Sequence, residues 1–309
     1  MTEPRQPEQS SRKRLSDAAT VGTYRMGALA AKLMPGPVAA AAASSLGFGA
    51  SFSSPARRAM IERHLKRVNP KLRGPSLRVA AQQAFDSYAK YYMESFRLPS
   101  LSQRTVDRNF SVDGFGRVND ALELGNGCIF ALPHLGGWEW AGRWMTDRGY
   151  PMTVVVEALE PPELFEWFAD LRKELGMTVI PTGPGAAAAV SAALKRNDIV
   201  CLLCDRDIER NGVEVEFFGE RTTLPAGPAM LGLRTGAPVL PVGCYYTSAY
   251  NGHHAVVRPA LSMVRSGDGL RADVARITQT LAYELEFLIR RAPEQWHLFQ
   301  PNWPSDPGY

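Results

Sequence analysis

The chain has 309 residues, 45% hydrophobic and 21% charged, a composition typical of a globular protein that excludes a disordered or fibrous chain. The net charge of +4 is unevenly distributed: residues 1–75 hold 13 Lys/Arg against 4 Asp/Glu, a balance of +9, and the remainder holds 22 against 27, a balance of −5. A basic front end on a mildly acidic body indicates an anionic partner. Because no basic-aromatic RNA-recognition motif occurs, we expect a lipid surface and no nucleic acid.

The N-terminal region predicts contact with a membrane surface. Residues 1–14 are polar and are expected to form a disordered tail, and residues 15–75 are expected to form a basic amphipathic, membrane-associating helical segment. Residues 15–52 are interrupted by Arg25, Lys32 and two prolines, which argues against a transmembrane helix or a signal peptide. Interfacial helices would instead place apolar residues against lipid, namely Leu15, Val21, Leu29 and Leu33. A soluble helix that packs on the rest of the protein is the alternative.

Beyond this segment, helical periodicity alternates with short buried runs. Helices are predicted over residues 56–68, 77–97, 137–148, 162–176, 186–197, 228–236 and 272–293. Strands are predicted over residues 128–134, 152–158, 177–182, 198–207, 237–246 and 253–259. This order predicts an α/β fold: a single domain, residues 76–309, with a mostly parallel central sheet flanked by helices, plus the N-terminal amphipathic helical extension.

Two predicted strands run into polar residues at one edge of the sheet. The strand over 128–134 ends at His134, one of only 5 histidines, and the strand over 198–207 contains Asp205. Ligands bind outside the carboxyl ends of the strands in an open parallel sheet, so these side chains are expected to converge there. Glu139 is expected in the first turn of the next helix, above the same edge.

This arrangement predicts a histidine general base held by a carboxylate. We expect Nε2 of His134 to lie within hydrogen-bond reach of a carboxylate at the mouth of a groove. No G-x-S-x-G motif occurs, which argues against an α/β-type serine hydrolase, so a substrate hydroxyl becomes the expected nucleophile of an acyl transfer. Gly136 and Gly137 would let the backbone approach the substrate and offer N–H groups to an oxyanion. A structural, partly buried histidine is the alternative.

Signatures of cofactors and metals are missing from the sequence. Neither G-x-x-x-x-G-K-[ST] nor G-x-G-x-x-G occurs, so we expect no nucleotide cofactor. Cys201 and Cys204 form a C-x-x-C pair, but no second pair or histidine cluster completes a zinc site. We expect all four cysteines to be buried, reduced thiols, which favours a reducing compartment.

Three segments carry a resemblance to a known family. They read LPHLGGWEWAG, VVVEALEPPELFEWFADLR and VCLLCDRDIERNGVEVEFFGERTTLPAGPAMLGLRTGAPVLPV. Together they resemble the lysophospholipid acyltransferase superfamily, and within it the branch of lipid A lauroyl/myristoyl acyltransferases and phosphatidylinositol mannoside acyltransferases. The family motif H-x4-D/E corresponds to His134 through Glu139, and the resemblance covers nearly the whole chain.

The resemblance implies an O-acyltransferase that takes its acyl group from a thioester, here acyl-CoA as co-substrate, and places it on a sugar hydroxyl of a glycolipid. It implies that His134 is the general base with an acidic partner. Position favours Asp205 as that partner, with Glu139 orienting the histidine or supporting its helix, and Glu214 as a second candidate. Substrate-binding roles are expected for Glu157, Arg172, Arg206, Glu214 and His297.

The donor is expected to occupy apolar and basic surfaces. The phosphates of coenzyme A are expected near Arg206, Arg210 and Arg221. The acyl tail needs a dry groove beside His134, to which aromatic residues can contribute, although most of them are expected in the core: Trp138, Trp140, Trp144, Trp167 and Phe168.

One run of sequence bears on the choice of branch. DRDIERNGVEVEFFG is more similar to the mannoside enzymes than to the lipid A enzymes, which tend to carry D-Q in place of D-R. The expected acceptor is therefore a mannose of phosphatidylinositol mannosides, and the expected location is peripheral, on the anionic cytoplasmic face of the cell membrane. The alternatives are a lipid A-type or lysophospholipid acyltransferase with a different acceptor, and a non-catalytic lipid-binding protein.

Overall fold

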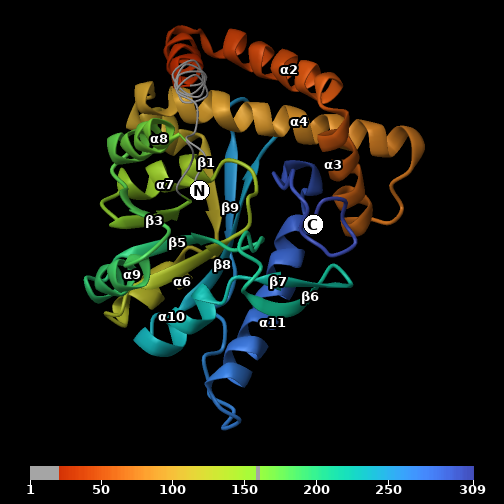
Figure 1. Ribbon diagram of the computed structural model, residues 1–309. Coiled ribbons are helices and arrows are strands. Elements are labelled where there is room, and N and C mark those ends of the chain that lie inside the picture. The colour runs from red at the N-terminus through yellow and green to blue at the C-terminus, as the bar shows by residue number, and fades with distance from the viewer. Residues whose placement is uncertain (1–20, 158–160) are drawn as a thin grey trace, which may run out of the picture.

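A seven-stranded sheet forms the centre of the protein. The structure is a computed structural model that describes residues 21–157 and 161–309, so the predicted tail over 1–14 lies outside the described residues, as does Leu15. The strands of the sheet are β1 (Phe110–Asp113), β2 (Cys128–Leu132), β3 (Met152–Val156), β4 (Thr178–Pro181), β5 (Ile199–Leu203), β8 (Val239–Tyr246) and β9 (His253–Val257). Their order across the sheet is β1-β9-β8-β2-β5-β3-β4 (Figure 1).

The predicted α/β fold with a mostly parallel sheet is confirmed. β2 pairs in parallel with β5 and β8, and β3 pairs in parallel with β4 and β5. At one edge, β9 runs antiparallel to β8 and carries β1 parallel to itself. The prediction lacked β1, because four residues are too few to establish a period, and it lacked the separate antiparallel hairpin of β6 (Val213–Phe217) and β7 (Glu220–Leu224).

Helices cover both faces of the sheet. One face carries α5 (Gln103–Arg108), α6 (Gly116–Glu123) and α7 (Trp138–Thr146). The other face carries α9 (Ala186–Lys195), α10 (Gly227–Thr235) and α11 (Leu270–Arg290). The remaining long helices are α3 (Pro55–Val68), α4 (Gly74–Arg97) and α8 (Pro162–Glu174), and α4 crosses one end of the molecule (Figure 1).

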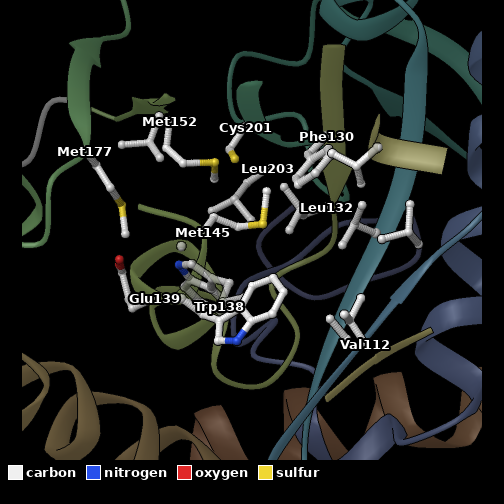
Figure 2. A pocket seen from close by; sticks show the side chains of 18 of the residues that line it. Val112, Phe130, Leu132, Trp138, Glu139, Met145, Met152, Met177, Cys201 and Leu203 are labelled. Atoms are coloured by element: carbon white, nitrogen blue, oxygen red, sulfur yellow. The ribbon is translucent and has the colours of Figure 1, made fainter. Parts of the chain in front are cut away.

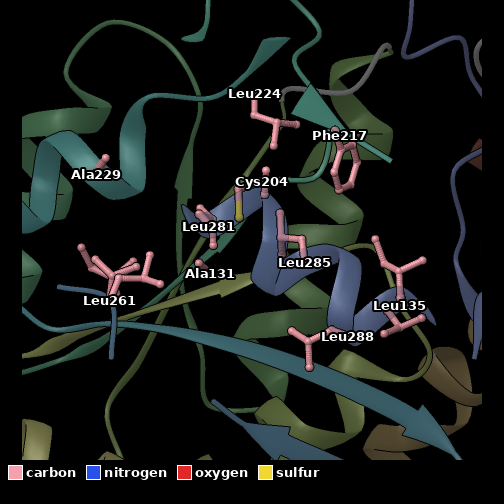
Figure 3. Close-up of a cluster of buried hydrophobic side chains, with 14 of the residues drawn as sticks. Ala131, Leu135, Cys204, Phe217, Leu224, Ala229, Leu261, Leu281, Leu285 and Leu288 are labelled. Atoms are coloured by element: carbon pink, nitrogen blue, oxygen red, sulfur yellow. The ribbon is translucent and has the colours of Figure 1, made fainter. Parts of the chain in front are cut away.

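The sheet separates two apolar cores, because successive side chains of a strand point to opposite faces. In β2, Cys128, Phe130 and Leu132 face α6 and α7 and belong to the core around the pocket of Figure 2. Ile129 and Ala131 face the other way, into the core that α11 lines with leucines (Figure 3). The strand is buried over its whole length for this reason.

The N-terminal helices form a layer on α4 and α8, which we call the N-terminal layer (residues 21–53). Residues 21–33 are helical, and α2 (Gly36–Ser53) follows and lies along α4 (Figure 1). Small side chains face inward and are buried: Ala28, Ala31, Ala39 and Ala43. Large apolar side chains are exposed: Met26, Leu29, Leu33, Val38, Leu46, Phe48 and Phe52.

The N-terminal layer has features of both expected arrangements, the membrane-associating segment and the soluble helix packed on the rest of the protein. It packs on the domain as a soluble helix would, yet it leaves a row of large apolar side chains exposed. The expectation that Val21 faces lipid is wrong, because Val21 is buried in the cluster that includes Phe96 and Phe168. A search of the described helices finds none with the length and apolar character needed to cross a bilayer.

Candidate active site

Strand register brings His134 and Asp205 together across 71 residues of sequence. Leu132 of β2 pairs with Leu203 of β5 at the carboxyl ends of these parallel strands. His134 and Asp205 each lie two residues beyond this pair, so the chain places them opposite one another. Nδ1 of His134 lies 2.6 Å from Oδ1 of Asp205.

The ring nitrogen in this contact differs from the one expected. The sequence predicted a carboxylate on Nε2, but Asp205 binds Nδ1. The reason is local: Oδ2 of Asp205 also accepts the backbone N–H of His134 at 3.0 Å, and Nδ1 is the ring nitrogen closer to that backbone. One carboxylate can therefore hold both groups only through Nδ1. Nε2 makes no hydrogen bond with any residue of the described ranges.

Asp205 is fully buried and remains ionised. Burial acts to raise its pKa, but the charge of His134 and hydrogen bonds from His134 and Trp296 lower the pKa to about 2. The indole Nε1 of Trp296 donates to Oδ2 at 2.7 Å, and the side-chain amide of Asn302 donates to the backbone carbonyl at 3.2 Å. Since an ionised carboxylate can only accept, Nδ1 of His134 carries the proton, and the lone pair of a neutral imidazole lies on Nε2.

Glu139 forms a separate buried pair. Its Oε1 accepts from Nη2 of Arg172 at 2.6 Å, from Nε of Arg172 at 3.1 Å and from the hydroxyl of Tyr91 at 3.1 Å. Burial raises the pKa of Tyr91 well above its ordinary value, and the neighbouring Glu139 charge raises it further. Glu139 therefore links α7 to α4 and α8. These contacts fit the expectation that Glu139 supports its helix. They do not fit the alternative that it orients His134 by direct contact.

The two glycines after His134 are required by packing against β8 and its neighbours. Gly136 has a φ of 59°, and an added Cβ would lie 2.3 Å from the carbonyl oxygen of Cys244. A Cβ on Gly137 would lie 2.8 Å from the ring of His253. The N–H of Gly136 donates to the carbonyl of Gln295 at 3.0 Å. The expectation that Gly136 offers an oxyanion donor is therefore wrong.

A groove lies in front of His134 and gathers most of the predicted substrate-binding residues. The side chains that line it include His134, Trp138, Glu157, Arg172, Arg206, Arg210 and His297. Glu157 follows β3, the neighbour of β5, and accepts from Nη2 of Arg206 at 3.1 Å. Arg210 stacks its guanidinium on the ring of Tyr309 at 4.1 Å. The groove thus combines the imidazole of His134 with the guanidinium groups of Arg172, Arg206 and Arg210.

His297 is a second, buried histidine of this groove. Its backbone N–H donates to the carbonyl of His134 at 2.7 Å, and Nε2 lies 2.8 Å from the hydroxyl of Ser87. Burial and the charge of His134 lower the pKa of His297 to about 3, so its ring is neutral at ordinary pH. Nδ1 has no hydrogen-bond partner among the described residues.

Two predicted residues do not reach the site. Glu214 and Arg221 lie on the β6–β7 hairpin, where they pair with each other at 3.3 Å and are largely exposed. Neither lines the groove of His134. The hairpin strands alternate apolar and polar residues, and both side chains fall on the polar, solvent-facing side. Glu214 is therefore wrong as an acidic partner, and Arg221 is wrong as a residue near the groove.

An apolar pocket adjoins the groove between α7 and the sheet. Figure 2 shows its lining, with Phe130, Leu132, Met145, Met152, Met177, Cys201 and Leu203 around one space. Its volume is about 80 Å³, well below the roughly 300–1,000 Å³ that is common for ligand pockets, so the pocket is narrow in this structure. The pocket and the groove are adjacent, because five residues line both: Trp138, Val155, Val156, Arg172 and Leu203.

The aromatic residues singled out in the sequence divide between pocket, groove and core. Trp138 lines both the pocket and the groove, Trp144 lines the pocket, and Phe168 lines the groove. Trp140 is buried and stacks on His253, and Trp167 packs under the N-terminal layer. All four cysteines are free, as expected, and Cys201 is the half-buried one.

Sequence reasoning missed Trp296 and Asn302, which hold Asp205 in place. Both lie in the closing segment PEQWHLFQPNW, where two tryptophans with N–H donors stand beside a histidine and an asparagine. A mixture of buried aromatic and polar residues near a chain end is a usable signal for such a role. Their partner, however, lies 91 residues away from Trp296, and no local pattern gives that pairing.

Comparison with known proteins assigns the family. A model for the family described as "Bacterial lipid A biosynthesis acyltransferase" matches residues 8–305. A "Phosphatidylinositol mannoside acyltransferase" of Mycobacterium tuberculosis (strain ATCC 25618 / H37Rv) is 40% identical over 228 residues, 72% of this chain and 70% of the relative. One of Mycolicibacterium smegmatis (strain ATCC 700084 / mc(2)155) is 38% identical over 223 residues, 71% of each chain. The protein therefore belongs to the bacterial lipid A biosynthesis acyltransferase family and is an O-acyltransferase.

Proposed function

We propose that the protein transfers a long-chain acyl group from acyl-CoA to a mannose hydroxyl of a phosphatidylinositol mannoside, with His134 as general base. The observation that carries this proposal is the His134–Asp205 contact at 2.6 Å, which leaves Nε2 open toward the groove. Nδ1 keeps its proton and donates it in a hydrogen bond to the carboxylate. Nε2 of the neutral ring therefore has the lone pair that a base needs.

In this mechanism the acceptor hydroxyl attacks the thioester carbonyl while Nε2 of His134 takes the hydroxyl proton. Asp205 holds the tautomer and stabilises the imidazolium as it forms. The tetrahedral intermediate then collapses, the carbon–sulfur bond breaks, and the thiolate of coenzyme A takes the proton from Nε2. Ester, free thiol and neutral imidazole result, so atoms and charges balance without a cofactor.

The apolar pocket is the proposed site of the acyl chain, and its side chains would have to move apart to hold a long chain in a space that is now about 80 Å³. It shares Trp138 and Leu203 with the groove, and its walls in Figure 2 are almost entirely hydrocarbon and thioether. An acyl chain there would be removed from water, which is favourable by about 0.8 kcal/mol for each buried CH2 group. The thioester at the end of such a chain would lie at the junction with the groove, beside His134.

The polar groove is the proposed site of the sugar and of the donor phosphates. Arg206 and Arg210 are suited to the phosphates of coenzyme A because both line the groove. Glu157, Arg172 and His297 are suited to sugar hydroxyls. Nδ1 of the neutral His297 ring has no protein partner in the described ranges and can exchange a hydrogen bond with a hydroxyl. The relatives named as phosphatidylinositol mannoside acyltransferases support mannose as the acceptor.

The N-terminal layer is the proposed membrane contact, on the anionic cytoplasmic face of the cell membrane. Leu33 and Phe52 are 77% and 70% exposed, and the layer is followed directly by the basic α3. Large apolar side chains beside Lys/Arg fit a peripheral surface that inserts at the headgroup level.

The test is thioester consumption by purified protein with palmitoyl-CoA, with and without phosphatidylinositol mannosides. The proposal expects release of coenzyme A that depends on the mannoside, together with a mannoside heavier by one palmitoyl group in mass spectrometry. Release only with a lysophospholipid or a lipid A precursor would replace the acceptor and keep the mechanism. Binding of the acyl chain with no release in any mixture would instead indicate a non-catalytic lipid-binding protein.

A further inference from the structure

The C-terminal segment of the chain crosses the region around His134 and Asp205, which we call the catalytic corner. We call residues 296–306 the C-terminal strap. Its backbone follows the segment that holds the histidine: Leu135 and Trp296 form an isolated antiparallel bridge, and the N–H of His297 donates to the carbonyl of His134. His134 is thus fixed by the strap through backbone contacts, independently of its side chain.

The strap also reaches the carboxylate itself. Nε1 of Trp296 donates to Oδ2 of Asp205 at 2.7 Å, while Oδ1 accepts from the imidazole at 2.6 Å. The indole is 4% exposed and packs in the core that contains Leu135 and Phe217 (Figure 3). Because the indole of Trp296 is packed on all sides, its N–H has a fixed position. Each carboxylate oxygen of Asp205 therefore has its own partner: Oδ1 binds the imidazole and Oδ2 binds the indole.

We propose that Trp296 is the positioning residue of the reaction, which holds the Asp205 carboxylate at the angle that keeps Nε2 of His134 facing the groove. This inference rests on the proposed function of His134 as the base. Without the indole, Oδ2 keeps only the backbone N–H of His134, and the carboxylate can turn about its Cβ–Cγ bond. The imidazole follows that rotation, because Nδ1, its one ring nitrogen with a hydrogen bond to the described residues, is bound to the carboxylate.

The strap is anchored at its far end to α3. Asp306 accepts from Nε of Arg63 at 2.9 Å and lies 3.2 Å from Nε2 of the buried His64. It also accepts the backbone N–H groups of Asn302 and Trp303. Although burial opposes it, hydrogen bonds from His64 and Asn302 lower the pKa of Asp306, so it remains ionised. Trp296 therefore lies on a segment fixed at both ends.

The chain offers a matched control for the role of the indole. Trp303 is equally buried on the same segment, and its Nε1 donates to the carbonyl of Phe217 at 3.0 Å and not to Asp205. Trp296→Phe and Trp303→Phe each remove one buried indole and one hydrogen bond. A merely structural role would give similar losses in both variants, whereas a positioning role separates them.

The experiment compares kcat and KM of both variants at a temperature where each is folded by circular dichroism. We expect Trp296→Phe to lower kcat about 10- to 100-fold with KM for mannoside within twofold, as loss of one hydrogen bond to a charged group implies. Trp303→Phe should keep kcat within about twofold. In the Asp205→Asn background, Trp296→Phe should have no further effect, because the indole acts through that carboxylate. Equal kcat in the two single variants would overturn the proposal.

A second measurement covers the case in which Trp296→Phe does not fold. In wild-type protein with 15N-labelled tryptophan, the indole proton bound to Asp205 should move in Asp205→Asn, while the Trp303 signal, assigned with Trp303→Phe, stays in place. No moved indole signal would refute the contact. Wild-type protein without transfer activity would instead refute the proposed function, so the two failures are distinguishable.

Discussion

The catalytic corner and the N-terminal layer are held together in opposite ways. Both carboxylate oxygens and the backbone carbonyl of Asp205 accept hydrogen bonds from the protein, and Asp205 is 0% exposed. The N-terminal layer packs on α4 and α8 mainly through alanines, together with Val21 and Tyr24, and most of its large apolar side chains are exposed. The first region is fixed by contacts within the protein, whereas the second exposes the apolar side chains that we propose as a membrane contact. The proposed chemistry and the proposed membrane contact thus lie in different parts of the protein.

This comparison predicts that changes in the two regions affect different measurements. A defect in the corner should reduce transfer and leave vesicle binding unchanged. A defect in the layer should reduce vesicle binding and leave turnover of dispersed substrate unchanged. The variants below test this separation, from the largest expected effect to the smallest.

Asp205→Asn should give the largest effect. An amide cannot hold the Nδ1–H tautomer of His134 as a carboxylate does, and loss of such a carboxylate in a comparable pair costs roughly 10⁴ in kcat. Steady-state transfer measures it. Asp198→Asn is the matched control, because Asp198 is another buried carboxylate and precedes the same strand β5. Equal losses in both variants would contradict a special role for Asp205.

Glu139→Gln should mainly lower stability. It leaves the buried guanidinium of Arg172 without its 2.6 Å carboxylate partner, and breaking a buried pair from one side costs about 3–5 kcal/mol. Urea unfolding measures the free energy, with Glu163→Gln on the exposed start of α8 as the control. Turnover per folded molecule should stay within about tenfold of wild type. A loss of kcat as large as that of Asp205→Asn, with unchanged stability, would assign Glu139 to the chemistry.

Serine at both Leu33 and Phe52 should weaken binding to anionic vesicles about 10- to 100-fold, because each large apolar side chain contributes roughly 1.5–3 kcal/mol when fully buried and less at an interface. Vesicle co-sedimentation measures the partition. Val264→Ser is the control, since Val264 is 73% exposed and lies between β9 and α11. Figure 1 places the start of α11 at the end of the molecule away from α2. An equal loss in the control would show that the layer has no special affinity.

His297→Gln should give the smallest effect, a change in how stability depends on pH. In the folded protein the pKa of His297 is about 3, and in the unfolded chain it is about 6.5, so only the unfolded state takes up this proton between those values. Stability of the wild type is therefore lost as the pH falls below about 6.5. Between pH 7.5 and 5.5, the wild type should lose about 1 kcal/mol more than His297→Gln in urea unfolding. An identical pH dependence would show that the ring is not held neutral.

Much of the fold and half of the site could be predicted from the sequence. The parallel sheet follows from alternating periods, and the convergence of His134 and Asp205 follows from strand ends that share an edge. Glu139 was placed correctly in the first turn of α7, but its partner Arg172 belongs to α8 and required the tertiary structure. The hairpin of β6 and β7 has a readable alternation in VEVEF, which would also have shown that Glu214 faces solvent.

The remaining features depend on contacts that no local pattern contains. Trp296 binds a carboxylate 91 residues away, and the choice of Nδ1 over Nε2 depends on a backbone N–H that competes for the same carboxylate. The inward face of the N-terminal layer is mostly alanine, and alanines give too weak a hydrophobic periodicity to show that Val21 is on the buried side. The division between segments at residues 75 and 76 stays a prediction.

The most direct test of the account is palmitoyl transfer to phosphatidylinositol mannoside by His134→Ala, measured beside wild type and His254→Ala. His254 is a half-exposed histidine on β9 that pairs with Asp113, so it controls for loss of an imidazole elsewhere. We expect the rate of acyl transfer by His134→Ala to fall at least about 10³-fold, while its unfolding transition and its binding to vesicles stay unchanged. His254→Ala should remain active. Unchanged transfer by folded His134→Ala would contradict the general-base role.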